Sequence, residues 1–378
     1  DNQEFKLGNV TIRVMHTPGH TLESTTYLLL DEEGKMNSIF SGDTLFIGDV
    51  GRPDLAVKSD LTKEDLAGMM YESIHNKILP LPDELTVYPG HGAGSACGKN
   101  LSSETTDTLG NQKASNYALD LKLSKADFIT ELTTGILPPP QYFPKNAMMN
   151  MNGYEAFEDV KDKALKSFDA KTFRSVAEST EALVLDTRHQ SKFMESHIPG
   201  SIFIGIDGNF APWVGALITD IRQPILIVAD EGKADEIVTR LSRVGYDSTI
   251  GFLEGGLEGW KAAGLETDDM PSISSEQFEK MYNKELNVLD VRKPGEFEAE
   301  HLENAESIPL DFINSNMEKI DSNKNYYAHC AGGYRSVIFG SILKSRGLHN
   351  LTNIEGGYDQ LSKTSIPKTN FVCPSQKK

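Results

Sequence analysis

Cysteine is scarce in this sequence, whose 378 residues contain only Cys97, Cys330 and Cys373. An odd number of widely separated cysteines argues against a framework of disulfide bonds, which is typical of small secreted domains. We therefore expect a reducing, cytoplasmic environment, in which any of the three thiols is available for chemistry.

Long apolar stretches and an excess of positive charge are also lacking. No run approaches the roughly 20 apolar residues of a membrane-spanning helix, which predicts a soluble protein without a membrane partner. The 37 Lys and Arg residues are outnumbered by 55 Asp and Glu residues, so the net charge is −18. Such a surface repels nucleic acid, and we expect none as a partner. An anionic substrate would need a local basic site.

The length and composition indicate a globular protein with more than one domain. Apolar residues make up 38% of the chain and charged residues 24%, which excludes a disordered or fibrous protein. At roughly 150 residues per domain, the chain has room for two or three domains.

An internal repeat organises the second half of the chain. LVLDTRHQSKFMESHIPGSIFIGI begins at Leu183, and VLDVRKPGEFEAEHLENAESIPL begins at Val288. Four residues recur 104 positions later: Asp186, Arg188, Phe193 and His197 return as Asp290, Arg292, Phe297 and His301. Short β-branched runs alternate with helical stretches in both copies. This pattern predicts two α/β domains with parallel sheets, over residues 160–268 and 269–372.

Residues 1–155 lack this repeat. Val10–Val14 and Thr26–Leu30 have the composition of strands, and the second is almost wholly apolar, so we expect it to be buried on both faces. Thr62, with Asp65 three residues later, predicts a capped helix. The charged segment 161–166 is the candidate boundary to the first repeat.

Cys330 lies in the sequence YYAHCAGGYRS, after a predicted strand and before a Gly pair, Arg335 and a helix. Backbone N–H groups of such a turn, the helix N-terminus and the Arg side chain together form an anion cradle. A thiol held there ionises readily and stabilises a persulfide, which makes Cys330 and Arg335 the candidate catalytic residues. The rest of the persulfide-cradling loop is Ala331, Gly332, Gly333, Tyr334 and Ser336. A buried structural cysteine is the alternative.

The spacing of this loop separates two kinds of enzyme. Cysteine phosphatases place five residues between Cys and Arg, whereas four separate Cys330 from Arg335. The shorter loop favours a single sulfur atom over a tetrahedral phosphoryl group. With the two Asp-x-Arg motifs and an EGG that occurs in both copies, residues 160–372 resemble a tandem rhodanese, a sulfurtransferase whose Cys carries a persulfide.

The first copy departs from this pattern. Cys330, Gly333 and Arg335 are replaced there by Asp230, Lys233 and Asp235. Without a thiol this copy cannot form a persulfide, and its added acids would repel anions. It resembles an inactive rhodanese domain, for which a scaffold role is favoured over a binding role.

Three loop motifs in residues 1–155 have the order and approximate spacing of the metallo-β-lactamase fold. They are HTPGHT at 16–21, GDTLF at 42–46 and YPGHG at 88–92. His20 and Asp43 match the ligand positions of that fold. Such ligands suit Fe(II), as part of a facial triad, or Zn²⁺ in a hydrolase. A lone His or Asp is ordinarily structural, but three motifs in sequence favour a metal site.

The stretches SGDTLFIGDVGRPDL and LPPPQYFPKN narrow the resemblance to the persulfide dioxygenases. This resemblance implies one Fe(II) and the oxidation of a low-molecular-weight thiol persulfide by O₂ to sulfite. It also implies that Arg52 binds the thiol or orders the site. His91 would be a nearby residue that does not bind the iron and that either supports the metal ligands or contacts the substrate. Cys97 lies in a Gly-rich loop that could approach the site, although a simple loop residue is the favoured interpretation.

The first metal motif of this family, His-x-His-x-Asp-His, does not occur in the 378 residues, and residue 1 is Asp. We therefore expect that the sequence begins inside the metallo-β-lactamase domain. The third protein ligand of the iron would then lie upstream of residue 1.

The predicted fold class is a multidomain α/β protein. An incomplete αββα metallo-β-lactamase-like domain is followed by an inactive and then an active rhodanese-like domain. The expected activity releases sulfite and transfers the outer sulfur of a Cys330 persulfide to sulfite, giving thiosulfate in sulfide detoxification. One alternative is a glyoxalase II-like hydrolase, in which Asp43 bridges two zinc ions and His91 binds the second. Another is a non-enzymatic persulfide carrier. The sequence leaves open which thiol carries the substrate sulfur and whether the protein is a homo-oligomer.

Overall fold

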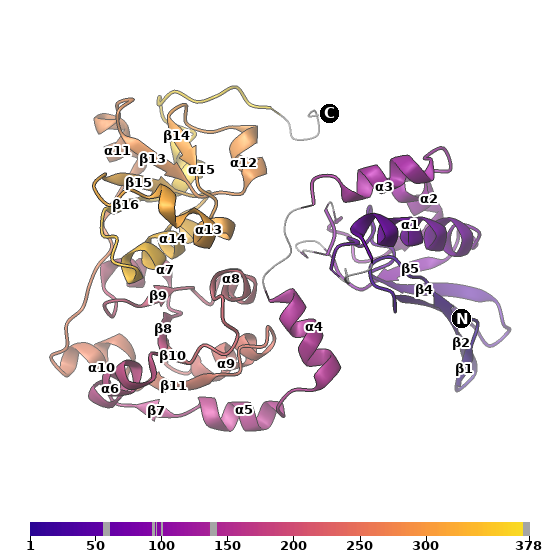
Figure 1. Cartoon of the computed structure of the whole chain (residues 1–378), viewed down its shortest axis with the longest axis horizontal. Coiled ribbons are helices and arrows are strands. Elements are labelled where there is room, and N and C mark those ends of the chain that lie inside the picture. Colours follow the sequence, from indigo (N-terminus) through magenta and orange to yellow (C-terminus); the bar gives the residue numbers. More distant parts are fainter. Residues whose placement is uncertain (56–60, 93–94, 96, 100, 137–141, 373–378) are drawn as a thin grey trace. The chain divides into compact units, whose positions relative to one another are not determined.

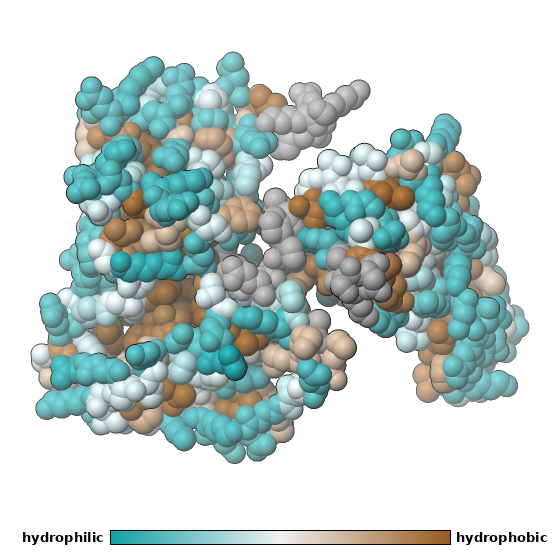
Figure 2. Space-filling model, viewed as in Figure 1, coloured by the Kyte–Doolittle hydropathy of each residue, from teal (hydrophilic) through white to brown (hydrophobic). Residues whose placement is uncertain are grey.

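The computed structural model describes residues 1–55, 61–92, 95, 97–99, 101–136 and 142–372. The chain divides into two compact units, Asp1–Phe143 and Pro144–Lys378 (Figure 1). Residues 137–141 of the LPPPQYFPKN stretch and Cys373 lie outside the described residues. Among the helices in the described ranges, none has the length and apolar character needed to cross a membrane. Hydrophilic side chains cover most of the face shown in Figure 2.

The first unit is built on a six-stranded sheet in which the strands follow one another in chain order. They are β1 (Glu4–Leu7), β2 (Val10–His16), β3 (Thr25–Leu30), β4 (Met36–Gly42), β5 (Thr86–Pro89) and β6 (Asp107–Thr108). Neighbouring strands are antiparallel except β4 and β5, which are parallel. The two strands predicted from the sequence are confirmed as β2 and β3.

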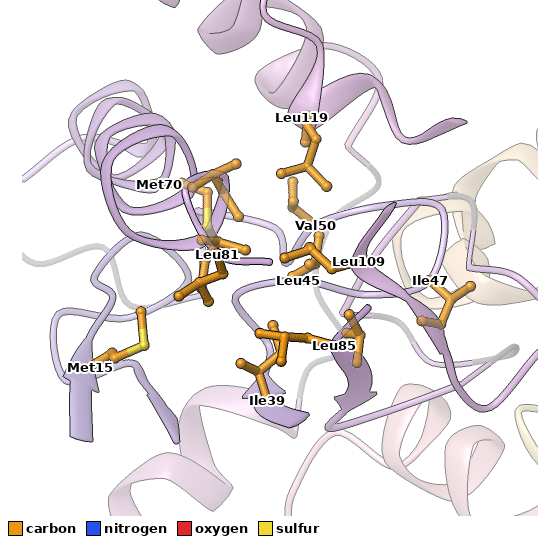
Figure 3. Packing of buried hydrophobic residues seen from close by; sticks show 14 of the residues in the cluster. Met15, Ile39, Leu45, Ile47, Val50, Met70, Leu81, Leu85, Leu109 and Leu119 are labelled. Carbon is orange, nitrogen blue, oxygen red and sulfur yellow. The ribbon is translucent and has the colours of Figure 1, made fainter. Parts of the chain in front are cut away.

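Helices cover one face of this sheet (Figure 1). They are α1 (Lys63–Ser73), η1 (Ile74–Ile78), α2 (Leu109–Ser115), η2 (Tyr117–Leu119) and α3 (Lys125–Thr133). The predicted cap of α1 is confirmed, because the Thr62 side chain accepts from the Asp65 N–H while the Asp65 carboxylate accepts from the Thr62 N–H. Figure 3 shows the core, where Met15 and Ile39 of the sheet meet Met70 of α1.

The expectation that β3 is buried on both faces is wrong. Leu28 is 1% exposed, but the neighbouring Tyr27 is 44% exposed. Tyr27 pairs with Phe40 and Phe40 with Tyr88, which forms an exposed aromatic row across three strands. Side chains alternate between the faces of a strand, and the helices pack only on the face that carries Leu28.

The second unit contains two five-stranded sheets of identical topology, ordered β7-β11-β10-β8-β9 and β12-β16-β15-β13-β14. All their strand pairs are parallel, as predicted. The first sheet comprises β7 (Ser167–Phe168), β8 (Leu183–Asp186), β9 (Ile202–Phe203), β10 (Ile225–Val228) and β11 (Thr249–Leu253). The second comprises β12 (Ser272–Ile273), β13 (Asn287–Asp290), β14 (Ala305–Ser307), β15 (Tyr326–His329) and β16 (Leu351–Ile354).

Helices accompany both sheets. With the first are α4 (Phe143–Asn152), α5 (Phe157–Ala164), α6 (Ala170–Thr180), α7 (Gln190–Glu195), α8 (Phe210–Leu217), α9 (Ala234–Ser242) and α10 (Gly256–Ala262). With the second are α11 (Ser275–Met281), α12 (Pro294–Ala299), η3 (Leu310–Phe312), α13 (Ile313–Asn316), η4 (Met317–Lys319), α14 (Tyr334–Ser345) and α15 (Gly357–Leu361). The charged segment 161–166 is helical through Ala164, and its helix α5 packs on β11.

The four recurring residues perform the same structural task in both copies. The Arg188 guanidinium donates to Asp186 and to the Ser196 carbonyl, and Arg292 donates likewise to Asp290 and the Glu300 carbonyl. Each recurring His ring stacks on the recurring Phe of its own copy. The repeat therefore joins the end of β8 or β13 to the helix that follows it.

Helix α14 is buried on more than one side. Every residue from Ser336 to Leu343 is buried. One face of α14 packs on β15 and β16 of its own repeat, and another packs on β9 and α7 of the first repeat (Figure 1). The two copies thus share α14 as a common core element.

Candidate functional site

Two sets of side chains converge in the structure, one in each unit. In the first unit, Asp43 directly follows β4, and His91 lies two residues after the end of β5, so these parallel neighbours present both residues at one edge of the sheet. His20 comes from the loop between β2 and β3. Asp43 Oδ2 lies 3.2 Å from His20 Nε2 and 3.3 Å from His91 Nε2. Buried Leu45 and Val50 anchor the segment that carries Asp43.

The orientation of His20 fits a metal ion. Its Nδ1 lies 2.8 Å from the Arg52 carbonyl oxygen, which can only accept, so Nδ1 carries the ring proton. In the neutral ring, Nε2 then directs a lone pair at the Asp43 carboxylate. Two acceptors at this distance repel unless a cation or proton lies between them. A histidine fixed by a carbonyl behind the ring is typical of metal ligation.

Two glycines make room for this arrangement. A Cβ atom on Gly51 would lie 2.1 Å from the Asp43 carbonyl oxygen, and one on Gly90 would lie 2.5 Å from Asp43 Oδ1. Neither position tolerates a side chain without movement of Asp43. Gly51 of GDVGRPD and Gly90 of YPGHG are therefore required for steric reasons.

Cys97 lies at the same place. One ligand atom each from His20, Asp43 and Cys97 lie within 4.8 Å of one another. Burial raises the pKa of the Cys97 thiol, and the charge of Asp43 adds to this effect. Burial raises the pKa of Asp43 as well, but a hydrogen bond and positive charge from the His20 ring, which only the protonated form of that ring supplies, lower it by more. The structure thus brings Cys97 beside His20 and Asp43, an approach that the sequence allowed, although a simple loop residue was the favoured interpretation.

Arg52 organises the loops around the site. Its side chain donates to both carboxylate oxygens of Asp54 at 2.6 and 2.7 Å. Its backbone N–H donates to the Cys97 carbonyl at 2.8 Å, and its own carbonyl holds His20. Asp49, which the sequence did not single out, accepts from the N–H groups of Val50 and Lys99. Of the two roles considered for Arg52, this geometry favours the ordering of the site.

The second set surrounds Cys330, which directly follows β15 and is 1% exposed. The Gly333 N–H donates to Cys330 Sγ at 3.1 Å, and the Ser336 hydroxyl lies 3.6 Å from the same sulfur. Gly333 has a φ of 98° and is the N-cap of α14. Ala331 and Gly332 form the outer part of the turn, where Gly332 is exposed. The predicted order of strand, thiol, turn and helix is thus present.

Arg335 is held by a residue that the sequence analysis did not identify. Its two terminal nitrogens donate to the two carboxylate oxygens of Glu296 at 2.6 and 2.8 Å. Burial raises the pKa of Glu296, but hydrogen bonding and charge from Arg335 lower it by more, so this carboxyl stays ionised. Glu296 stands between the recurring Arg292 and Phe297, and this neighbourhood is the signal that could have identified it.

The EGG motif supports the loop from behind. A Cβ atom on Gly357 would lie 2.4 Å from the carbonyl oxygens of Cys330 and Ala331. The N–H groups of Tyr358 and Asp359 donate to these carbonyls at 2.7 and 3.0 Å. These bonds turn the loop carbonyls away from the sulfur. The recurrence of EGG therefore reflects close packing of one backbone against another.

A fully buried histidine precedes the thiol. Burial lowers the pKa of His329, and the negative charge of Asp290 opposes this without overcoming it. Among the described residues, His329 Nε2 has no hydrogen-bond partner. His329 is therefore neutral in the folded protein.

The corresponding loop of the first repeat has paired charges. Lys192 Nζ lies 2.8 Å from Asp230 Oδ1, and Lys161 Nζ lies 2.6 Å from Asp235 Oδ2. The two acids expected to repel anions are therefore each neutralised by a lysine. Arg188, Lys192 and Asp230 contribute to the lining of a cavity of about 570 Å³.

Comparisons with known proteins find two rhodanese-like domains in the second unit. The rhodanese-like domain family matches residues 169–263 and 274–364. A crystal structure of a metallo-β-lactamase from Staphylococcus aureus is 34% identical, covers 67% of this chain and 70% of that chain, and has a TM-score of 0.58.

Two curated relatives match shorter parts. The mitochondrial persulfide dioxygenase ETHE1 of Homo sapiens is 27% identical over 151 residues, which is 40% of this chain and 51% of the relative. The hydroxyacylglutathione hydrolase of Dictyostelium discoideum is 37% identical over 93 residues, which is 24% of this chain and 31% of the relative. The chain thus spans about a third to a half of these relatives. It belongs to the proteins that fuse a metallo-β-lactamase fold to rhodanese-like domains.

Proposed function

We propose that the chain is a persulfide dioxygenase and sulfurtransferase. The matches support a role in sulfur metabolism and a metal-binding site. The finer proposal is that one Fe(II) is held by His20 and Asp43, and that a thiol persulfide, O₂ and water give the thiol, sulfite and protons. Cys330 would then carry sulfur to the sulfite. The cradle around Cys330 Sγ is the observation that supports this most directly.

The residues of the first unit would bind and orient the metal and its substrate. The Arg52 carbonyl keeps the His20 lone pair aimed inward, and Asp43 supplies the negative charge. A bound iron would supply the activation of O₂. Arg52, His91 and Cys97 would contact the substrate or order the site around it.

Sulfur transfer at Cys330 proceeds in two balanced steps. The Cys330 thiolate attacks the outer sulfur of a persulfide, so that a new S–S bond forms and the donor leaves as a thiolate. Sulfite then attacks the outer sulfur of the Cys330 persulfide. The S–S bond to Cys330 breaks, thiosulfate leaves, and the thiolate returns. The Gly333 N–H and the start of α14 stabilise the negative sulfur in both steps.

The test compares Cys330→Ser with Cys97→Ser in the full chain. Cys330→Ser should abolish thiosulfate formation from a thiol persulfide and sulfite, while O₂-dependent sulfite production continues. Cys97→Ser should retain thiosulfate formation. Loss of thiosulfate in the Cys97 variant alone would overturn the assignment. Steady-state thiosulfate formation by the wild type would exclude a carrier that performs no catalysis.

A thioester hydrolase with two zinc ions is the second candidate. Asp43 Oδ2 lies almost equally far from His20 Nε2 and His91 Nε2, as a carboxylate between two metal positions would. Metal analysis and O₂ uptake separate the candidates. One iron per chain with O₂ uptake on a thiol persulfide supports the dioxygenase, and two zinc ions with thioester hydrolysis support the hydrolase.

A further inference from the structure

The side chain of Tyr334 leaves its own repeat. This residue lies in the loop between Cys330 and Arg335 and begins α14. Its hydroxyl donates to the Gly205 carbonyl oxygen of the first repeat at 2.7 Å. Its ring meets the buried Phe203 ring edge to face, with centroids 5.7 Å apart.

Gly208 completes the seat of this ring. A Cβ atom at position 208 would lie 2.3 Å from Cζ of Tyr334. The backbone of Gly208 is not in the left-handed region, so its own conformation does not demand glycine. Glycine is needed at position 208 because any side chain there would collide with the Tyr334 ring. Burial raises the pKa of Tyr334, so its hydroxyl remains protonated as a donor.

A second bond fixes α14 to the same strand. The Phe203 N–H donates to Ser341 Oγ at 3.0 Å. Tyr334 and Ser341 are two turns apart on α14, so the first repeat contacts the helix at two points along its length. The groups that touch Cys330 Sγ flank Tyr334, because Gly333 precedes it and Ser336 follows two residues later.

We propose that the first repeat positions the Cys330 loop of the second through Tyr334. Gly205, Gly208 and Phe203 act as positioning residues that hold the tyrosine, and the tyrosine sets the Gly333 N–H and the Ser336 hydroxyl against the sulfur. A repeat without a thiol thereby serves the sulfur chemistry of its neighbour. The inference rests on the proposed sulfur transfer at Cys330.

The test is Gly208→Ala in the full chain, with Gly295→Ala as the matched control. A Cβ at position 295 meets no atom within 4 Å. We expect Gly208→Ala to lower thiosulfate formation on the order of tenfold or more, since small displacements of reacting groups have such effects. It should also speed the alkylation of the buried Cys330 by iodoacetamide, followed by peptide mass spectrometry. Gly295→Ala should match the wild type in both measurements.

A double-mutant cycle separates positioning from general damage. When Tyr334 is already Ala, adding Gly208→Ala should change neither rate, because the ring that it displaces is absent. Tyr334→Phe removes only the bond to Gly205 and should have a smaller effect than Gly208→Ala. Wild-type rates in Gly208→Ala, or an equal loss in the Tyr334→Ala background, would overturn the inference. If the wild type transfers no sulfur, the proposed function fails, and the alkylation rates alone decide the positioning.

Discussion

Glu296 and Lys192 occupy equivalent positions of the two repeats and carry opposite charges. Glu296 binds Arg335, next to the thiol loop, through two hydrogen bonds. Lys192 binds Asp230, the residue that replaces the thiol. Each repeat therefore has an ion pair between the helix after the Asp-x-Arg motif, α7 or α12, and the loop that follows β10 or β15. The helix supplies the cation in the first repeat and the anion in the second. In the second repeat the acid of the pair, Glu296, binds Arg335 and does not take the position of the thiol. In the first repeat the acid of the pair, Asp230, stands at the position of the thiol itself.

Removal of the charge of Glu296 should release the Arg335 guanidinium from its fixed orientation. We expect Glu296→Gln to reduce the rate of sulfur transfer by about tenfold, because two charge-assisted bonds are weakened and the guanidinium loses its fixed orientation. Stopped-flow measurement of thiosulfate formation checks this. The control is Glu298→Gln, an exposed residue of the same helix. A Glu296 variant as fast as this control would contradict the expected role.

Arg335→Lys should keep the positive charge and lose the planar fork. A lysine can bind one oxygen of Glu296 but cannot span both. We expect a marked fall in sulfur transfer, by about tenfold, rather than complete loss. The measurement is the rate of thiosulfate formation together with the thiol pKa from the pH dependence of Cys330 alkylation. An unchanged rate and thiol pKa would show that the backbone cradle alone suffices.

The stability of the second unit should fall in mild acid. Burial lowers the pKa values of His329 and His197 below the ordinary 6.5, so the unfolded chain takes up their protons first. Their contribution is fully present above pH 6.5 and is lost as the pH falls towards the lowered values. Each can remove at most about 1.4 kcal/mol per pH unit.

Urea unfolding followed by tryptophan fluorescence measures this effect, because both tryptophans, Trp213 and Trp260, belong to the second unit. Between about pH 7 and about pH 5.5, His329→Gln should lose less stability than the wild type. The control is His349→Gln, at an exposed position. Equal pH slopes in all three proteins would show that His329 is not the responsible group.

Gly90→Ala should disturb the metal site. The new methyl group would collide with Asp43 Oδ1 and with the backbone of Gly42, at 2.5 and 3.1 Å. We expect the affinity for a divalent metal to fall by about 10 to 100-fold, as is typical when groups around the ligands are changed. Metal titration of the full chain, with circular dichroism as a check of folding, tests this. Gly92→Ala is the control, since its Cβ meets no atom within 4 Å.

Features formed by residues that are close together in the chain were predicted correctly from the sequence. Strand, thiol, glycine turn and helix follow one another around Cys330, and the capping box at Thr62 is local in the same sense. The repeat predicted two similar domains, and the alternation of short β-branched runs with helical stretches predicted a parallel sheet in each. These features need no knowledge of distant contacts.

Long-range contacts were missed. The partners Glu296 and Arg335 are separated by 39 positions, and Tyr334 meets Gly205 over 129 positions. The exposed face of β3 escaped prediction because apolar composition does not say how many layers cover a strand. The approach of the Cys97 loop to the site was considered but not favoured, since the Arg52 N–H that holds this loop comes from a different segment.

The burial of α14 between two repeats imposes an order on biosynthesis. A helix apolar on several sides has no stable place until both of its neighbours exist, and β9 belongs to the copy that leaves the ribosome first. The thiol-free repeat can therefore be complete when the Cys330 segment emerges, and it offers a ready surface for the nascent helix. The reactive loop would then acquire its shape against a template made earlier in the same chain.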